Sequence, residues 1–236
     1  MYSRRIYERA CSWVLPPRRG FRHFYHWLDR FYDGCTGYRV TSVSGHALDL
    51  DRFEDVRVVR FIRDPRDLLV SGYYYHLRGA EEWTAHVDPQ PGDWEQHNGL
   101  VPSGIPSGES MQSFLAKVSL EDGMRAELEF RARHFQSMRA WPDDDPRVRL
   151  FKYEDVLGNE LAVFREIFDF FELPWLARAR GGLYAKRHAA GRRAADTRHI
   201  RDARAGQWRT ALPKSVVTMV DAQYGDVLER YGYPRT

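Results

Sequence analysis

The sequence has few cysteines and no long apolar run. Its 236 residues include two cysteines, Cys11 and Cys35, which are too few for a disulfide framework or a four-cysteine metal site. No stretch approaches the roughly 20 consecutive apolar residues of a membrane-spanning helix. These absences exclude a disulfide-stabilised domain and a membrane span within this sequence, so we expect a soluble cytoplasmic protein.

Lysine is also scarce, because all but four of the 36 basic residues are arginine. The planar guanidinium group recognises phosphate and sulfate through paired hydrogen bonds, which a lysine ammonium cannot do. Arginine therefore favours an anionic ligand, although a high-GC genome would give the same bias. The net charge of only +3, with 43% hydrophobic and 29% charged residues, is ordinary for a soluble protein. The length fits one α/β domain over residues 1–236.

Residues 58–76 (VVRFIRDPRDLLVSGYYYH) are the most informative stretch of the chain. The apolar run at their start predicts a buried strand of a parallel sheet. Asp64 then suits the N-cap of a helix whose first residue is Pro65. Arg63 is thereby placed at the carboxyl end of the strand and Ser71 on the following helix, where α/β sheets bind ligands. A guanidinium and a hydroxyl near a helix N-terminus suit a phosphate.

The same spacing also fits a plain ion pair between Arg63 and Asp67. The segment R-D-P-R-D-x-x-x-S-x-Y-x-x-H, however, resembles the 3′-phosphate-binding motif of sulfotransferases that use 3′-phosphoadenosine 5′-phosphosulfate (PAPS). The arginine and serine of that motif fall on Arg63 and Ser71. The resemblance implies an α/β sulfotransferase fold, with a P-loop-like parallel sheet flanked by helices. It also implies PAPS as the donor, adenosine 3′,5′-bisphosphate as the product, and no metal.

The family holds the 5′-phosphosulfate in a loop that reads roughly P-[KR]-S-G-T-T-W. Here we expect a strand at residues 13–15, a basic turn at residues 16–20 and a helix from Phe21 onward. In this register Arg18 takes the Lys/Arg place and Gly20 the glycine place, and the donor would contact these residues, Arg19, Phe21 and Arg22. Arg19, Phe21, Arg22 and His23 depart from the family pattern. The alternative is a basic surface turn before a helix.

A catalytic histidine is expected after a second strand. Residues 40–48 (VTSVSGHAL) predict a strand that ends in a Ser-Gly-His turn. The family carries its catalytic base at the end of a strand upstream of the 3′-phosphate motif, which implies His46 as the base. His76 is a weaker candidate. The alternative for His46 is an ordinary surface histidine.

Two further segments resemble family motifs. Residues 147–153 (RVRLFKY) predict a strand, and the Y-E-D sequence at its end implies that Tyr153 packs against the adenine ring. Residues 199–209 (HIRDARAGQWR) resemble R-K-G-x-x-G-D-W-K, a flexible loop that closes over the nucleotide. In this register Arg201 grips the 3′-phosphate, and Gly206 and Trp208 match their family counterparts.

The remaining segments carry less information. Residues 78–109 are rich in proline and glycine and predict a long irregular loop, whose tryptophans either line an acceptor pocket or pack locally. Apolar spacing predicts helices over residues 124–138, 161–171 and 213–230. The run Asp143–Asp145 predicts a solvated turn and not a metal site.

The resemblance implies an enzyme that transfers a sulfuryl group from PAPS to a hydroxyl or amine of a small-molecule, lipid or sugar acceptor. His46 would remove the acceptor proton and Arg18 would stabilise the leaving group. One alternative is an inactive nucleotide-binding protein of the same fold. The other is a nucleic-acid-binding module that uses the basic residues 186–204, although nucleic acid is not the partner we expect.

Overall fold

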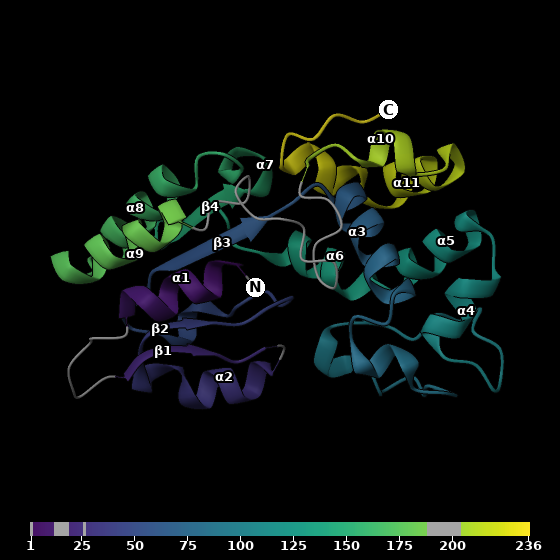
Figure 1. The fold of residues 1–236 in the computed structure, drawn as a ribbon, viewed down its shortest axis with the longest axis horizontal. Helices are drawn as coiled ribbons and strands as arrows, with labels where there is room; N and C mark the ends of the chain where they lie inside the picture. The colour runs from purple at the N-terminus through teal and green to yellow at the C-terminus, as the bar shows by residue number, and fades with distance from the viewer. Residues whose placement is uncertain (1, 12–18, 26, 188–203) are drawn as a thin grey trace. The chain divides into compact units, whose positions relative to one another are not determined.

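The computed structural model describes residues 2–11, 19–25, 27–187 and 204–236. The chain forms two compact units. The sheet unit comprises Met1–Ile62 and Pro142–Ala194, and the helical unit comprises Arg63–Trp141 and Ala195–Thr236. As expected, the fold is mixed α/β, with parallel strands flanked by helices (Figure 1).

The described part of the sheet unit contains two pairs of parallel strands. β1 (Arg19–His23) pairs with β2 (Tyr38–Ser42), and β3 (Val58–Ile62) pairs with β4 (Val148–Lys152). Ile62 lies opposite Lys152, so β3 and β4 end at the same level. The helices and 3-10 turns of this unit are α1 (Tyr2–Cys11), α2 (Leu28–Gly34), η1 (Cys35–Gly37), η2 (Leu50–Arg52), α7 (Tyr153–Val156), α8 (Glu160–Phe170) and α9 (Trp175–Arg187).

The core of the sheet unit forms between helices and strands. Buried side chains of α8, including Phe164 and Phe168, pack with Tyr7 of α1. Figure 1 shows α8 and α9 side by side, with α1 next to α9. Small residues allow this approach, since a Cβ at Gly181 would lie 2.9 Å from the Cβ of Ala10. Removing the aromatic surface from water is the main stabilising contribution here.

The expectation for the N-terminal segment is wrong where the structure describes it. Residues 12–18, which include Arg18 and the expected strand, lie outside the described part. Strand β1 includes Gly20, Phe21 and Arg22, which were expected in a turn and a helix. The strand forms because the Phe21 backbone pairs with Val40 of β2 and the Phe21 ring stacks on Tyr7. The helix begins only at Leu28.

Gly20 is explained by packing and not by a phosphate-binding turn. Its φ is not positive, and a Cβ at this position would clash with the carbonyl oxygen of Cys11. The glycine therefore lets α1 approach β1, a role that needs the absence of a side chain and not an unusual backbone conformation.

The other expected strands agree better with the structure. β3 and β4 lie within the predicted segments and are confirmed. β2 is shifted toward the N-terminus and ends at Ser42, four residues before His46. Gly45, with φ +82°, makes the predicted turn between them.

The helical unit contains no strand among its described residues apart from an isolated bridge between Val87 and Ser110. Its elements are α3 (Pro65–Leu77), η3 (Glu82–Ala85), η4 (Glu95–His97), α4 (Met111–Lys117), α5 (Leu120–Phe130), α6 (Ala132–Ala140), α10 (Trp208–Ala211) and α11 (Lys214–Arg230). The helix expected over residues 124–138 is thus two helices that meet at Arg131. The predicted C-terminal helix is confirmed as α11, with a kink at Tyr224.

The segment expected to be a long irregular loop is held by an aromatic cluster. Trp83 stacks on Phe130 and on His97, with ring centroids 5.3 and 4.8 Å apart. Trp94 is 1% exposed and meets Trp83 edge-on at 5.0 Å. The two tryptophans therefore pack locally, which is one of the two alternatives that the sequence leaves open for this segment.

Neither a membrane-spanning helix nor a metal-binding cluster occurs among the described residues. No helix in the described ranges is long and apolar enough to cross a bilayer. Within the same ranges, no group of three or more His, Cys, Asp or Glu side chains is arranged to hold a metal ion. Cys11 and Cys35 are both buried and form no disulfide.

Candidate functional site

The first turn of α3 is fixed by a carboxylate cap. The Oδ1 atom of Asp64 accepts a hydrogen bond from the Arg66 amide at 2.9 Å, and Pro65 is the first helical residue, as the sequence predicts. The Arg66 guanidinium also donates to both Asp64 oxygens, at 3.0 and 2.8 Å, and to the Pro234 carbonyl at 2.8 Å. Arg66 is fully buried, so this pairing anchors the C-terminus of the chain to the start of α3.

Arg63 and Ser71 lie in the positions that the motif predicts. Arg63 directly precedes the cap, and its side chain is only 13% exposed. Its Nη2 donates to the Arg204 carbonyl at 3.1 Å and lies 3.6 Å from Oδ2 of Asp67. Ser71 is exposed on the same stripe of α3 as Asp67, one turn further along. Its hydroxyl is therefore accessible to a ligand, while the ion pair between Arg63 and Asp67 is also present.

The C-terminal motif meets α3 at Asp67. Asp67 is fully buried, and its Oδ2 accepts the Gly206 amide at 2.6 Å while its Oδ1 accepts the Trp208 amide at 2.9 Å. The Trp208 ring lies over the Arg66 guanidinium, whose carbon is 3.7 Å from the ring centroid. Two motifs about 140 residues apart in sequence are thus joined within the helical unit.

Sequence reasoning missed what Arg66 and Asp67 do. Both stand inside the motif and have local partners in Asp64 and Arg63, but their contacts with Pro234, Gly206 and Trp208 are remote in sequence, and no local pattern marks those contacts. Arg201, the residue expected to grip the 3′-phosphate from the C-terminal motif, lies outside the described residues.

His76 serves the packing of α3 against α5. Its Nδ1 lies 2.7 Å from Oε2 of the fully buried Glu127, whose Oε1 accepts from Nε of Arg131 at 2.6 Å. With 3% exposure, His76 has no access to an acceptor. In the neighbouring aromatic cluster, burial lowers the pKa of the His97 imidazole; His76 lowers it further, while Glu81 acts against the shift.

The other expected site residues belong to the sheet unit. His46 is half-buried and follows the turn after β2. Tyr153 is half-buried and is the first residue after β4, at the carboxyl end of that strand. Arg22 is exposed on β1 and lies over the Phe24 ring.

The phosphosulfate loop expected at residues 19–22 is not present as a loop. Arg19, Gly20, Phe21 and Arg22 have their backbone in β1, which pairs with β2, and the Phe21 side chain packs against the core. Backbone amides that take part in a strand ladder are not presented together toward an anion as they are at a helix N-terminus. The expected turn and helix at these residues are therefore wrong, while the contact of Arg19, Gly20, Phe21 and Arg22 with the donor stays a prediction.

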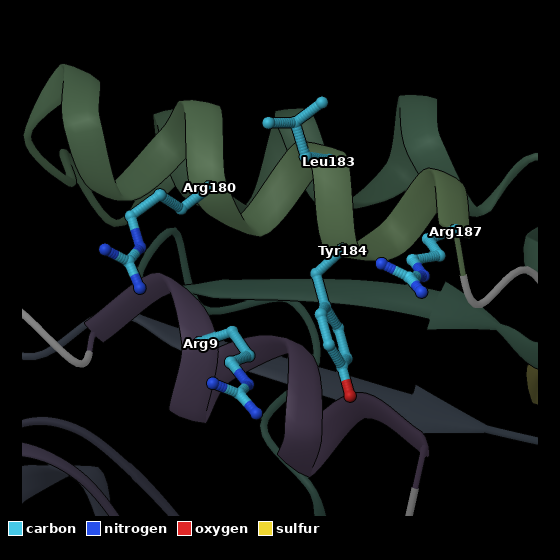
Figure 2. A pocket seen from close by; sticks show the side chains of 5 residues that line it. All are labelled: Arg9, Arg180, Leu183, Tyr184 and Arg187. Atoms are coloured by element: carbon cyan, nitrogen blue, oxygen red, sulfur yellow. The ribbon is translucent and has the colours of Figure 1, made fainter.

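An arginine-rich surface lies on the sheet unit, between α1 and α9. Arg9, Arg180, Leu183, Tyr184 and Arg187 line a hollow of about 360 Å³. Figure 2 shows the guanidinium groups of Arg9 and Arg187 on either side of the Tyr184 ring. The Arg9 guanidinium carbon is 5.7 Å from the centroid of that ring. No motif in the sequence predicts this hollow.

A search of curated proteins found no match. The family model of the sulfotransferase domain matches residues 52–232, which include Arg63, Ser71, Tyr153 and Arg201 but not His46 or the segment at residues 18–22. The matched region covers about three quarters of the chain, and the parallel strands flanked by helices are consistent with that fold. The chain belongs to the sulfotransferase domain family.

Proposed function

We propose that this protein transfers a sulfuryl group from PAPS to a hydroxyl or amine of a small-molecule acceptor, including a lipid or a sugar. The observation that carries the proposal lies in the helical unit, where the motif around Arg63 and the motif around Gly206 join at Asp67. Both are segments that the family uses at the 3′-phosphate of its donor. Their convergence supports a nucleotide site there more strongly than either motif does alone.

Arg63 and Ser71 bind the 3′-phosphate in this proposal. The guanidinium supplies several fixed N–H donors and a permanent positive charge, and the exposed Ser71 hydroxyl supplies one further donor. Arg201 is proposed as a second cation for the same phosphate, and Tyr153 as the partner of the adenine ring, both from the family resemblance.

The transfer step assigns proton movement to His46. The imidazole takes the proton of the acceptor hydroxyl or amine, while the oxygen or nitrogen atom of the acceptor forms a bond to sulfur. The bond between sulfur and the bridging oxygen breaks, and that oxygen keeps the electron pair in adenosine 3′,5′-bisphosphate. Arg18 is the proposed cation for this developing charge, so the chain itself supplies positioning and electrostatic stabilisation.

A second candidate is a nucleotide-binding protein of this family without transferase activity. It is favoured by the departure of residues 19–22 from the family loop and by the start of the family match at residue 52. The two candidates agree on nucleotide binding and differ only in turnover.

The experiment that separates them uses two measurements on the same preparation. Calorimetry with adenosine 3′,5′-bisphosphate reports binding, and mass spectrometry of PAPS incubated with a panel of phenols, sugars and amines reports transfer. The proposed transferase binds the nucleotide and yields a sulfated product that is lost in His46→Ala. Binding without any product across the panel contradicts the transferase and supports the second candidate.

A further inference from the structure

We propose that Asp67 is a positioning residue that couples the docking of the C-terminal segment, residues 204–208, to the availability of Arg63 for an anion. The inference rests on the proposed function, since the anion is taken to be the 3′-phosphate of the donor. It assigns to Asp67 a role in the same site that the family motif itself does not describe.

The charge of Asp67 is a problem for an anion site. Its carboxylate is fully buried, and Oδ2 lies 3.6 Å from Nη2 of Arg63. A carboxylate with no other donors at this distance would hold the guanidinium and repel a phosphate brought to it. A buried carboxylate must also be hydrogen-bonded, or it destabilises the folded chain.

The docked segment solves this problem with two backbone amides. The Gly206 amide donates to Oδ2 at 2.6 Å and the Trp208 amide to Oδ1 at 2.9 Å, so each carboxylate oxygen has its own donor. Hydrogen bonds to an ionised acceptor are stronger than neutral ones and spread its charge. With these donors in place, Asp67 depends less on Arg63, and the guanidinium can serve a phosphate.

A backbone conformation and two side-chain contacts hold the segment in this register. Gly206 has φ +76°, a conformation that brings its amide toward Asp67 and that residues with a side chain rarely adopt. Trp208 is 5% exposed, and its ring is held over Arg66. Arg63 adds a third link, because it donates to the carbonyl of Arg204.

Coupling of this kind is reciprocal. If docking of residues 204–208 raises the affinity of Arg63 for a phosphate, then phosphate binding must stabilise the docked segment by the same factor. Nucleotide binding should therefore stabilise the docked position of residues 204–208 against Asp67.

The test measures amide exchange and nucleotide binding separately in the full chain. Hydrogen exchange at the Gly206 and Trp208 amides is followed by NMR without ligand and with adenosine 3′,5′-bisphosphate, whose Kd is measured by calorimetry. The variants are Asp67→Ala, Asp67→Asn and Arg63→Ala. Asp122→Asn is the control, because it removes an exposed carboxylate at the start of α5 that accepts a hydrogen bond from the Ser119 hydroxyl.

We expect Asp67→Ala to speed exchange of both amides without ligand by roughly tenfold or more and to raise the Kd by about the same factor. Asp67→Asn keeps the size and one acceptor oxygen, so it should protect one amide and bind with intermediate affinity; it also serves if the alanine variant does not fold. Arg63→Ala should lose nucleotide affinity and the protection that ligand adds, and it should speed the ligand-free exchange less than Asp67→Ala does, because it removes only the hydrogen bond to the Arg204 carbonyl.

The outcomes that overturn the proposal differ from those that overturn the proposed function. Unchanged exchange in both Asp67 variants, or faster exchange with an unchanged Kd, contradicts the coupling while leaving nucleotide binding intact. A wild type that does not bind the nucleotide contradicts the proposed function, and the coupling to Arg63 fails with it.

Discussion

At the scale of single residues, Arg66 shows how much of the site depends on a side chain that no motif assigns. It is fully buried, it pairs with both oxygens of Asp64, and it lies under the Trp208 ring. Asp64 therefore does two things, since it caps α3 and neutralises a buried cation. An ordinary cap such as Ser119, which is exposed at the start of α5, does only the first.

This difference predicts unequal effects of removing the two caps. Asp64→Ala should lower the free energy of unfolding by about 3 kcal/mol, because it removes both carboxylate hydrogen bonds of a buried guanidinium and leaves it only the more distant Asp221 carboxylate, at 3.9 Å. Ser119→Ala should cost about 1 kcal/mol, the usual value for a cap. Urea unfolding of both variants measures this, and equal losses would show that the pairing with Arg66 contributes little.

The burial of His97 should make the free energy of unfolding depend on pH. Its pKa is lowered below the usual value of about 6.5 by burial, with Glu81 opposing the shift and His76 adding to it. On acidification the unfolded chain takes up a proton near pH 6.5, whereas the folded His97 does so only at lower pH. The free energy of unfolding should therefore fall as the pH drops from about 6.5 to the folded pKa and then stop changing on account of this group.

Urea unfolding at about pH 7.5 and about pH 5.5 tests this, with His97→Phe as the comparison. The variant keeps a ring against Trp83 but cannot titrate, so its loss of stability between the two pH values should be smaller than that of the wild type. An equal loss in both proteins would place the pH dependence on other groups.

At the scale of elements, the strands and helices that could be predicted are those whose sequence pattern lies within the element itself. The apolar run of β3, the cap at Asp64 and the proline at the first helical position lie next to each other in sequence and fold as expected. β4 and α11 follow from the same kind of pattern. The segment from Gly20 to Arg22 was not predictable in this way, because its strand depends on β2 and on the contact of Phe21 with Tyr7.

Close packing of α3 on α5 leads to a prediction at this scale. A Cβ at Gly72 would clash with Glu127 and Arg131, whereas a Cβ at Gly182 in α9 would meet its nearest neighbour, Leu161, at an ordinary 3.7 Å. Both glycines are helical, so alanine should gain up to about 1 kcal/mol from helix propensity at either position. Gly182→Ala should therefore stabilise the chain.

Gly72→Ala should instead destabilise it by about 1–3 kcal/mol, because overpacking disturbs the buried Glu127 and its partners. Thermal unfolding of the two variants provides the comparison. A stabilised Gly72→Ala protein would mean that α5 moves away at no cost and that the network around Glu127 is not rigid.

At the scale of the whole molecule, the family was recognisable from sequence, while the arrangement of the candidate site was only partly so. Arg63 and Ser71 lie where the motif implies, because a strand, a cap and a helix determine their positions. The role of Asp67 could not be predicted, since its partners lie about 140 residues away. The expected 5′ loop is also the part that the family match leaves out.

The alternative that the chain is a nucleic-acid-binding module can also be tested at the scale of the whole molecule. The hollow lined by Arg9, Arg180 and Arg187 is positively charged, and the basic run at residues 186–204 begins at the end of α9 in sequence. We expect only weak duplex DNA binding that disappears at physiological salt, measured by fluorescence anisotropy with a labelled duplex. Tight binding at that salt, weakened by the double change Arg180→Ala and Arg187→Ala and unaffected by adenosine 3′,5′-bisphosphate, would favour this alternative.

The central claim is that Arg63 binds the 3′-phosphate of the nucleotide, and calorimetry with adenosine 3′,5′-bisphosphate tests it most directly. The comparison includes wild type, Arg63→Ala and Arg125→Ala, the last an exposed arginine that pairs with Glu121 on α5. We predict that the wild type and Arg125→Ala bind alike, while Arg63→Ala binds about 10- to 100-fold more weakly, as expected for losing charged hydrogen bonds. Equal binding by all three proteins, or binding by none of them, would contradict the account.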